Sequence, residues 1–182
     1  AVFAAEATGK LLRHPGLAVL TAGPGVTNGV SAVTQAYFAG SPLVVLGGRA
    51  PNARWGTGSL QELDQPPLLS TVTKLSETAK TLDRVGPLVD EAFRAARASH
   101  RGPAFVDVPM DELFGRATLP LPSPPVAVRL EPDTDSQAEI ATLLAGAQRP
   151  LLVLGTDVWA DHAEEAALRF VDEVGIPVIT NG

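Results

Sequence analysis

Three groups of residues in this sequence have the types and spacing that could support chemistry. The first is a turn, Gly23-Pro24-Gly25 followed by Asn28, which comes directly after the apolar run 17–20. Glycines at the end of a strand let the backbone approach a ligand closely, and the helix that follows offers free N–H groups. Ligands bind at this edge in open α/β sheets. The turn is therefore a candidate binding site, although a plain strand-to-helix connection has the same composition.

The second group is a glutamine with neighbouring carboxylates in a polar loop, Gln61, Glu62 and Asp64. A neutral amide such as that of Gln61 can donate a hydrogen bond to a developing alkoxide without competing as a nucleophile. The two carboxylates are close in sequence, but neighbouring residues in a loop need not converge. We expect Glu62 and Asp64 to serve as loop or capping groups.

The third group consists of arginines. Arg49 and Arg54 flank a glycine-rich loop and could meet a carboxylate or a phosphate, although exposure to solvent is the commoner outcome for such residues. Trp55 in the same loop is expected to be a packing anchor. Arg101 follows a predicted helix, where a solvated side chain is the simpler interpretation.

Composition limits the class of protein. The chain has 182 residues, a formal net charge of −6, 45% hydrophobic residues and no cysteine. The acidic balance argues against a nucleic-acid partner, and the absence of cysteine excludes disulfides and thiolate chemistry. No apolar run approaches the ~18 residues that a membrane span needs. The three histidines lie far apart and are expected at helix ends or on the surface.

The elements that would position these residues alternate between apolar strands and amphipathic helices. Continuous apolar runs are typical of parallel strands that are covered on both faces, and three-to-four spacing of apolar residues indicates helices. Within the helix over 26–39 this spacing directs Val30, Val33, Ala36 and Tyr37 toward the sheet. The pattern predicts strands over 17–21, 43–46, 72–78 and 104–108, and helices over 2–12, 26–39 and 83–99.

A second β/α pattern follows a proline-rich stretch. Residues 115–132 contain five prolines without apolar periodicity and are predicted to form a semi-extended linker. Beyond it the sequence predicts helices over 135–145 and 162–173 and strands over 151–154 and 177–180. We expect one domain over 1–114 and the beginning of a second, Rossmann-like α/β domain over 133–182.

Several ordered motifs resemble the pyrimidine-binding domain of thiamine diphosphate enzymes, and most of all the catalytic large subunit of acetolactate synthase. The fold that this resemblance implies is α/β, a doubly wound parallel sheet that lacks its N-terminal part. The motifs are 23–28 (Gly-Pro-Gly-Val-Thr-Asn), 41–48 (Ser-Pro-Leu-Val-Val-Leu-Gly-Gly), 60–64 (Leu-Gln-Glu-Leu-Asp), 72–74 (Val-Thr-Lys), 101–109 (Arg-Gly-Pro-Ala-Phe-Val-Asp-Val-Pro) and, less specifically, 149–155 (Arg-Pro-Leu-Leu-Val-Leu-Gly).

The resemblance also implies an activity and its cofactors. It implies a cytoplasmic carboligase or decarboxylase of 2-keto acids that converts pyruvate to 2-acetolactate in branched-chain amino-acid synthesis. Thiamine diphosphate would lie between two copies of the chain in a homodimer or tetramer, with Mg²⁺ held by a C-terminal domain beyond this sequence and with FAD as a structural cofactor. By the same resemblance Gly23, Pro24, Gly25 and Asn28 would contact thiamine diphosphate, Gln61 the reacting carbon, and Arg101 FAD.

Some residues depart from the family pattern. Leu60 stands where acetolactate synthases carry phenylalanine, and Met110 stands where family members often carry lysine, which places FAD and the usual substrate channel in question. The family's catalytic glutamate would lie just before Ala1, so we expect the 182 residues alone to be inactive. Glu6 is expected to be an ordinary helix carboxylate rather than the catalytic base.

Other functions fit the same motifs. A 2-hydroxyacyl-CoA lyase, an oxalyl-CoA decarboxylase or a sulfoacetaldehyde acetyltransferase would share this scaffold, and a non-catalytic binding module could retain the fold. An NAD-binding Rossmann domain fits poorly, because Asn28 occupies the third glycine position of that fingerprint. Since the family pairs such domains across a dimer, we also expect this chain to expose apolar surface and to self-associate.

Overall fold

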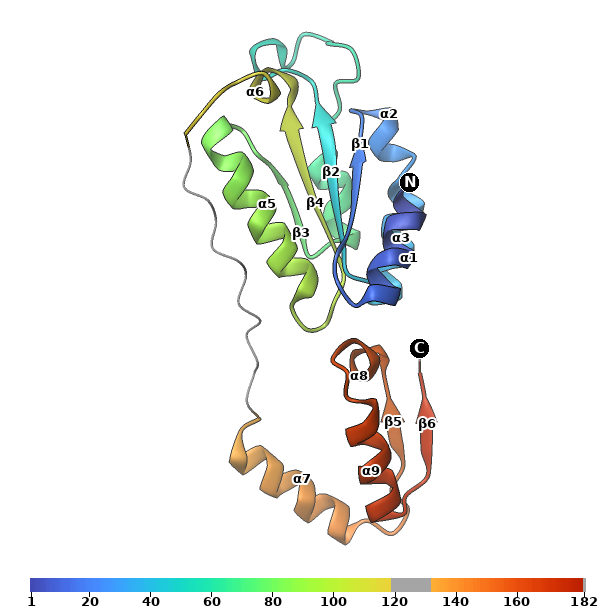
Figure 1. Cartoon of the computed structure of the whole chain (residues 1–182). Helices are drawn as coiled ribbons and strands as arrows, with labels where there is room; N and C mark the ends of the chain where they lie inside the picture. The colour runs from blue at the N-terminus through green and yellow to red at the C-terminus, as the bar shows by residue number, and fades with distance from the viewer. Residues whose placement is uncertain (119–131, 182) are drawn as a thin grey trace. The chain divides into compact units, whose positions relative to one another are not determined.

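The chain divides into two compact units, Ala1–Ser123 and Pro124–Gly182. The computed structural model describes residues 1–118 and 132–181, and each unit is described here by itself (Figure 1). The predicted linker over 115–132 therefore lies mostly outside the described residues. Among these residues, no helix combines the length and apolarity that crossing a membrane requires.

The first unit is built on a four-stranded parallel sheet in the order β1-β2-β4-β3. The strands are β1 (Gly16–Leu20), β2 (Leu43–Arg49), β3 (Leu75–Thr78) and β4 (Pro103–Pro109). Arg49 pairs with Pro109, so β2 and β4 end at the same level, and β1 ends two residues earlier, where Leu20 pairs with Gly47. This carboxyl edge of the sheet is where the chain collects the turns and loops that follow β1, β2 and β4.

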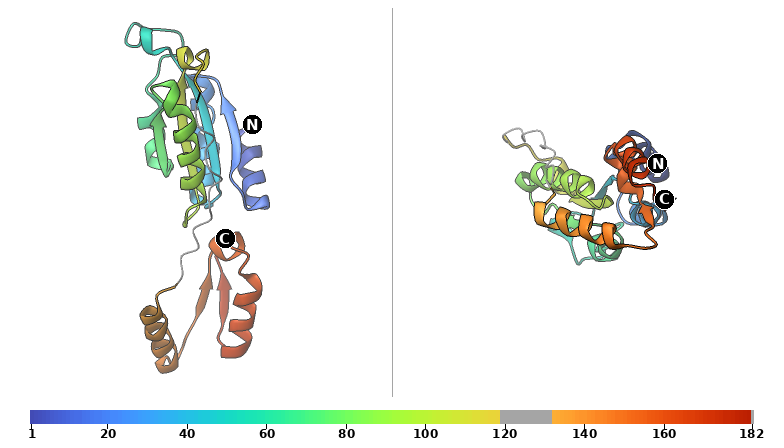
Figure 2. Two further views of the ribbon diagram at one scale, coloured as in Figure 1. Left: turned by 60° about the vertical axis from the view of Figure 1, so that its left-hand side comes forward. Right: turned by 90° about the horizontal axis from the view of Figure 1, so that it is seen from below.

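Helices cover both faces of this sheet, as expected for a doubly wound α/β fold. The helical segments are α1 (Val2–Leu12), α2 (Pro24–Thr27), α3 (Val30–Phe38), η1 (Asn52–Arg54), α4 (Gln65–Leu69), η2 (Ser70–Val72), α5 (Leu82–Arg97) and α6 (Met110–Leu113). Figure 1 shows α5 on one side of the strands and α1 with α3 on the other, and the turned views in Figure 2 show the same layers. The α/β prediction is confirmed.

The strands separate two apolar clusters by simple alternation. In β2, Leu43 and Val45 face the cluster beneath α1 and α3, and Val44 faces the cluster beneath α5. In β4, Phe105 joins the first cluster and Val106 the second. Burial on both faces explains why these two strands are mostly apolar, with Asp107 as the charged exception in β4.

The helix predicted over 26–39 is interrupted. Asn28 ends α2 and Gly29 precedes α3. A Cβ at Gly29 would lie 3.0 Å from Leu20 Cδ1 and 3.2 Å from Val2 Cγ2, so glycine allows the turn to pack closely against β1 and α1. The prediction that Tyr37 faces the sheet is wrong, because Tyr37 is 41% exposed.

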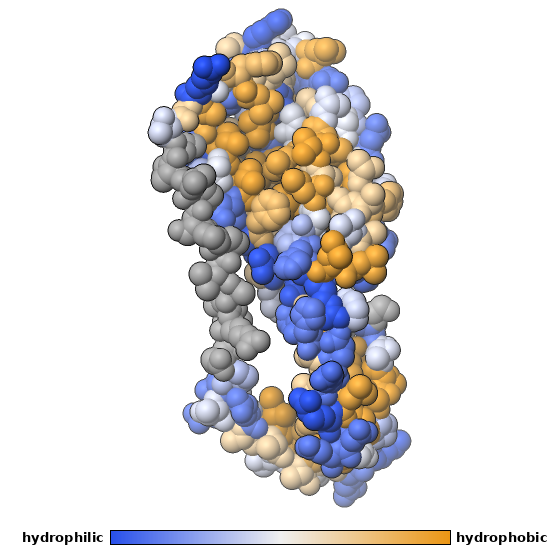
Figure 3. Space-filling view, in the orientation of Figure 1, coloured by the Kyte–Doolittle hydropathy of each residue, from blue (hydrophilic) through white to orange (hydrophobic). Residues whose placement is uncertain are grey.

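The expectation that β1 is covered on both faces is also wrong. Ala18 is buried beneath α1, whereas Leu17 and Val19 are 50% and 69% exposed. These two side chains point to the opposite face, and β1 is the outermost of the four described strands. Figure 3 shows broad apolar areas on the first unit.

The second unit is smaller and more open. Its parallel strands β5 (Leu152–Leu154) and β6 (Val178–Thr180) pair in register, and its helices are α7 (Thr134–Gly146), α8 (Thr156–Ala160) and α9 (Glu164–Val174). Among its described hydrophobic residues, only Ile176 is buried, with 9% of its surface exposed. Apolar side chains of α7 and α9, such as Ile140 and Leu168, stay exposed at 57% and 64%.

Candidate functional site

The turn after β1 is held in a conformation that requires glycine. Gly23 has φ +56° and ψ −112°, and a Cβ on it would lie 3.0 Å from both Cβ and the carbonyl oxygen of Gln61. A Cβ on Gly25 would lie 2.4 Å from Thr21 Cγ2. Both glycines are therefore explained by packing within the chain, whether or not a ligand binds.

A small hollow of about 180 Å³ lies beside this turn, between the turn and the start of α1. Gly25 and Asn28 line one side, and Val2 and Phe3 line the other. No charged side chain lines it, and Asn28 supplies an exposed amide. The chemistry of this lining fits a neutral, flat, partly apolar ring such as an aminopyrimidine, and it does not fit a diphosphate.

Gln61 is brought to the turn by the polar loop that follows β2. Its backbone has φ +61° and packs against Gly23, and its side chain is exposed. Leu60, which replaces the family phenylalanine, is 88% exposed. The fold therefore places the exposed side-chain amide of Gln61 next to the glycine turn, as a role for Gln61 in contacting a ligand there would require.

A buried ion pair lies at the same edge of the sheet. Asp107 of β4 is fully buried, and its Oδ2 accepts a hydrogen bond from Arg49 Nη1 at 3.1 Å. The same Arg49 atom lies 3.2 Å from Asp64 Oδ1, and the Arg49 guanidinium stacks on the Trp55 ring at 3.7 Å from its centroid. The prediction that Arg49 is exposed is wrong: its side chain is only 9% exposed, because a buried carboxylate needs a cationic partner. Trp55, expected to be a packing anchor, is 38% exposed, and its ring packs on Arg49.

Gln65 completes this cluster and was not singled out from the sequence. Its side chain is fully buried, and its Oε1 accepts a hydrogen bond from Gly23 N at 2.8 Å. Its Nε2 donates to Gly48 O at 2.9 Å and to Asp107 Oδ2 at 2.8 Å. The available signal was Asp107, a charge within an otherwise apolar strand, which predicts a buried polar partner.

The loop carboxylates have structural roles, Glu62 as a cap of backbone N–H groups and Asp64 as an ion-pair partner. Glu62 accepts hydrogen bonds from Gly56 N at 3.0 Å and from Ser59 N at 3.1 Å. Asp64 pairs with Arg49. These contacts fold the loop on itself and give neither carboxylate the arrangement of an acid–base pair.

Asp111 at the start of α6 fixes the other side of the loop. Its two carboxylate oxygens accept hydrogen bonds from Asn52 N and Ala53 N, each at 3.1 Å. Partial burial raises the pKa of Asp111, but the backbone N–H groups of Asn52, Ala53, Asp111 and Glu112 outweigh this and hold the pKa below its ordinary value of 3.8. The carboxylate form of Asp111 therefore stabilises η1.

Glu6 lies away from the glycine turn. It is 9% exposed and its Oε1 accepts a hydrogen bond from Ser41 Oγ at 2.6 Å, just before β2 begins. This is the amino edge of the sheet, opposite the edge where Gly23 lies. The position agrees with a structural helix carboxylate.

Arg101 is also at the amino edge, just before β4, and is not brought together with the turn or Gln61. It lines a hollow of about 370 Å³ with Lys74, His100, Tyr37 and Phe38. Lys74 Nζ donates to the carbonyl oxygens of Ala98 and His100, at 2.6 and 2.7 Å, which fixes the loop that carries Arg101. Basic and aromatic side chains thus gather at this edge.

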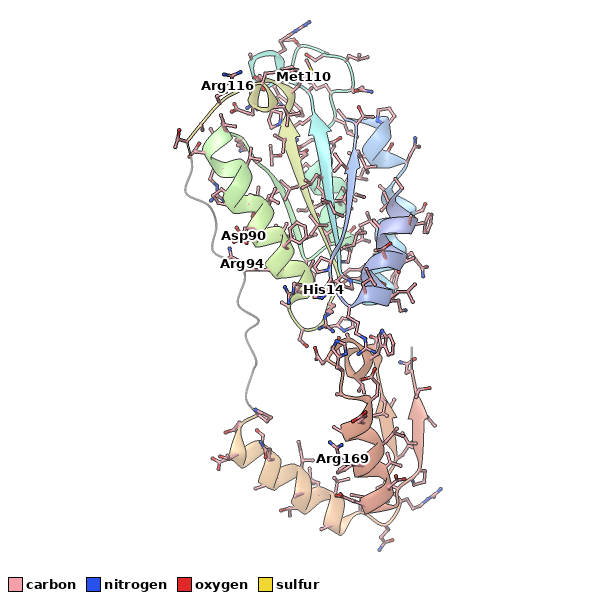
Figure 4. The ribbon with its side chains drawn as sticks, in the orientation of Figure 1. His14, Asp90, Arg94, Met110, Arg116 and Arg169 are labelled. Atoms are coloured by element: carbon pink, nitrogen blue, oxygen red, sulfur yellow. The ribbon has the colours of Figure 1, made fainter. Side chains whose placement is uncertain are left out.

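Met110 follows β4 at the carboxyl edge and is 52% exposed. Figure 4 shows Met110 at the end of the first unit toward which the strands run and His14 at the other end. Within residues 1–118 and 132–181, no three His, Cys, Asp or Glu side chains are grouped to hold a metal ion.

Comparison with known proteins adds to this geometry. The chain is 50% identical over 190 aligned residues to an acetolactate synthase large subunit of Mycobacterium tuberculosis, covering all of this chain and 34% of that protein. It is 32% identical over 219 aligned residues to 2-hydroxyacyl-CoA lyase 2 of Caenorhabditis elegans, covering 100% of this chain and 34% of the lyase. The chain thus spans about a third of the length of these curated relatives.

A solved structure shares the fold. The crystal structure of benzoylformate decarboxylase from Polynucleobacter necessarius matches 98% of this chain and 34% of its own chain with a TM-score of 0.89, at 22% sequence identity. The family description "Thiamine pyrophosphate enzyme, N-terminal TPP binding domain" matches residues 1–68, and "Thiamine pyrophosphate enzyme, central domain" matches residues 137–182. The chain belongs to the thiamine pyrophosphate enzyme family.

Proposed function

We propose that the protein containing this chain is a thiamine diphosphate-dependent carboligase that acts on 2-keto acids in the manner of acetolactate synthase. The observation that carries the proposal is the 50% identity to an acetolactate synthase large subunit along the whole chain. The geometry agrees with it, because the glycine turn, the neutral hollow and Gln61 lie together at the carboxyl edge of the sheet.

The hollow beside Gly25 and Asn28 is the proposed site for the aminopyrimidine end of the cofactor. Bound there, thiamine diphosphate would supply the electron sink that takes up the negative charge left when a 2-keto acid loses CO2. Val2 and Phe3 would exclude water from one side of the ring, and the Asn28 amide would orient it. Since the start of α1 lines the hollow, a glutamate placed directly before Ala1 would lie beside the ring.

Gln61 is the proposed substrate-facing residue. Its amide can hydrogen-bond a substrate carboxylate or a developing alkoxide while carrying no charge. Its backbone packs on Gly23, so a substrate close to the cofactor ring would also be within reach of this side chain.

The further cofactors and partners remain part of the proposal. Arg101, Lys74 and two aromatic side chains give the amino-edge hollow the cationic and stacking groups that a flavin nucleotide would need. Mg²⁺ would bind the cofactor diphosphate in another part of the longer protein. A second copy of the chain would complete the cofactor site, in a homodimer or tetramer in the cytoplasm.

The test is an assay of the protein expressed from its intact reading frame. Pyruvate consumption and acetolactate formation are measured with and without thiamine diphosphate and Mg²⁺. Cofactor-dependent acetolactate supports the proposal, and Gln61→Ala should then lower kcat, whereas Gln35→Ala, an exposed glutamine of α3, should not. No binding of thiamine diphosphate would overturn the enzyme function, and flavin absorbance of the purified protein tests FAD.

A 2-hydroxyacyl-CoA lyase is the second candidate. Over a 114-residue stretch the chain is 42% identical to 2-hydroxyacyl-CoA lyase 2 of Xenopus laevis, which covers 63% of this chain and 18% of that protein. Over the whole chain, the identity to the worm lyase is 32%. Cofactor binding without pyruvate turnover, together with cleavage of a 2-hydroxyacyl-CoA, would favour this candidate.

A further inference from the structure

We infer that Gln65 is a positioning residue that sets the conformation of the Gly23 turn and, through it, the place of Gln61. The inference deepens the proposed function and rests on it where it concerns the cofactor. Gln65 touches neither proposed ligand surface, so its action would pass entirely through the segments that it joins.

Each hydrogen-bonding group of the Gln65 side chain has a partner. The side chain is fully buried, both Nε2 hydrogens are donated, to Gly48 O and to Asp107 Oδ2, and Oε1 accepts from Gly23 N. Gly23 follows β1, Gly48 belongs to β2 and Asp107 belongs to β4. One amide thus ties together the ends of three parallel strands.

The Gly23 amide has reason to depend on this contact. Gly23 has φ +56° and ψ −112°. Glycine can adopt many other backbone conformations, so a contact is needed to hold Gly23 in this one. Gly23 N is buried with its acceptor, Gln65 Oε1, at 2.8 Å. Without the acceptor, this N–H would be buried and unpaired, which costs free energy. A movement of the turn that exposes the N–H to water would remove this cost.

Movement of the turn would reach Gln61 directly. The Gln61 backbone lies against Gly23 so closely that a Cβ on Gly23 would be 3.0 Å from the Gln61 carbonyl oxygen. Gln65 begins α4, four residues further along the same loop. Gln65 therefore fixes both surfaces of this contact, the turn by a hydrogen bond and the loop by its own backbone.

The surroundings also explain why an amide is needed. Gln65 Nε2 and Arg49 Nη1 approach the same oxygen of Asp107, at 2.8 and 3.1 Å. A carboxylate in place of the amide would face both Asp107 and the Gly48 carbonyl as a second negative group. An apolar side chain would leave three polar partners without this contact.

The test compares Gln65→Met, Gln65→Glu and the control Gln35→Met in the protein from its intact reading frame. Hydrogen exchange of the segment 21–29 reports the Gly23 amide, and titration with thiamine diphosphate and Mg²⁺ reports affinity. We expect Gln65→Met to speed exchange and weaken cofactor binding by at least about tenfold each, because the hydrogen bond to Gly23 N alone is worth about that much and is one of three that the variant loses, and we expect Gln35→Met to change neither.

Gln65→Glu separates positioning from general destabilisation. When protonated, the introduced carboxyl can accept from Gly23 N and donate to one of the other two partners, whereas when ionised it can donate to neither and is repelled by Asp107, which would displace it from Gly23 N. We expect this variant to bind thiamine diphosphate about tenfold more tightly near pH 6 than near pH 8, relative to the parent protein at each pH. This readout also decides the matter if Gln65→Met fails to fold.

The outcomes distinguish the inference from the proposed function. If the parent protein binds no thiamine diphosphate, the proposed function fails, and exchange of the Gly23 amide still decides whether Gln65 holds the turn. Folded Gln65→Met with parental exchange over 21–29 would overturn the inference. Faster exchange with parental cofactor affinity and no pH dependence in Gln65→Glu would overturn its extension to the cofactor site.

Discussion

Two buried carboxylates at opposite edges of the same sheet are held in different ways. Asp107, at the carboxyl edge, has no exposed surface and lies between the guanidinium of Arg49 and the amide of Gln65. Glu6, at the amino edge, is 9% exposed, and its Oε1 accepts a hydrogen bond from the Ser41 hydroxyl. The first is stabilised by a cation and an amide, the second by a single neutral donor.

The difference follows from what meets at each edge. At the carboxyl edge β2 and β4 end level and β1 ends two residues earlier, and the polar groups of the turns that follow need partners within this edge. A buried charge there is tolerated because several segments supply compensating groups. Glu6 ties α1 to Ser41, two residues before β2, and lies nearer water. The carboxyl edge should accordingly be the more sensitive to substitution.

The largest effect is expected for Asp107→Leu. This change leaves Arg49 without its buried partner and Gln65 Nε2 with one acceptor fewer, which should lower the free energy of unfolding by about 3–5 kcal/mol in urea denaturation. Asp64→Asn is the matched control, because Asp64 contacts the same arginine but is 61% exposed, and should cost less than about 1 kcal/mol. Equal losses of unfolding free energy in the two variants would show that the buried contact of Arg49 with Asp107 contributes no more than the exposed contact with Asp64.

Gly23→Ala should have the next largest effect. The substitution adds a Cβ that meets Gln61 and places alanine at φ +56°, which should cost about 1–3 kcal/mol in the free energy of unfolding. Gly56→Ala also places alanine at a positive φ, +82°, but its Cβ would meet nothing within 4 Å. The difference between the two variants measures the contact with Gln61, and identical losses would argue that this contact is loose.

A smaller effect is expected at the amino edge. Ser41→Ala removes the donor to the Glu6 carboxylate and should cost about 1–2 kcal/mol, measured by urea denaturation. Glu6→Gln keeps an oxygen acceptor for Ser41 and should cost less. Neither change should alter kcat in the assay for 2-keto acids, and a loss of kcat in a folded Glu6→Gln protein would contradict the structural role of Glu6.

The smallest effect is expected for the pH dependence of stability that Asp111 contributes through the loop after β2. Because the folded-state pKa of Asp111 is lowered, its stabilising contribution is present above the unfolded-state value and is lost as pH falls through the folded-state pKa. The difference in unfolding free energy between the parent and Asp111→Ala should be constant near neutral pH and shrink below about pH 4. A difference that grows on acidification would contradict the hydrogen bonds to Asn52 and Ala53.

Much of the fold was accessible from local sequence patterns. Buried strands such as β2 and β4 are continuous apolar runs, and the amphipathic period of α5 is strong, so their types and approximate positions follow from hydrophobic spacing. The exposure of Leu17 and Val19 in β1 was missed, because an apolar run indicates a strand and does not reveal which neighbours cover it.

The site was less accessible, for a related reason. The glycine turn and Gln61 could be singled out by residue type, and the structure brings them into contact. Gln65 looks like a loop residue before two prolines, and its partners Gly23 and Asp107 each lie 42 residues away in sequence. The burial of Arg49 likewise depends on Asp107, 58 residues away. Long-range polar contacts leave no local period to detect.

The stacking of Arg49 on Trp55 gives the carboxyl edge a built-in optical probe. The sequence contains two tryptophans, Trp55 in the first unit and Trp159 in the second. In a Trp159→Phe protein, fluorescence would arise from Trp55 alone, and its emission should move to longer wavelength when the ring leaves Arg49 and enters water. Opening of the loop at this edge could then be followed in real time, separately from unfolding of the second unit.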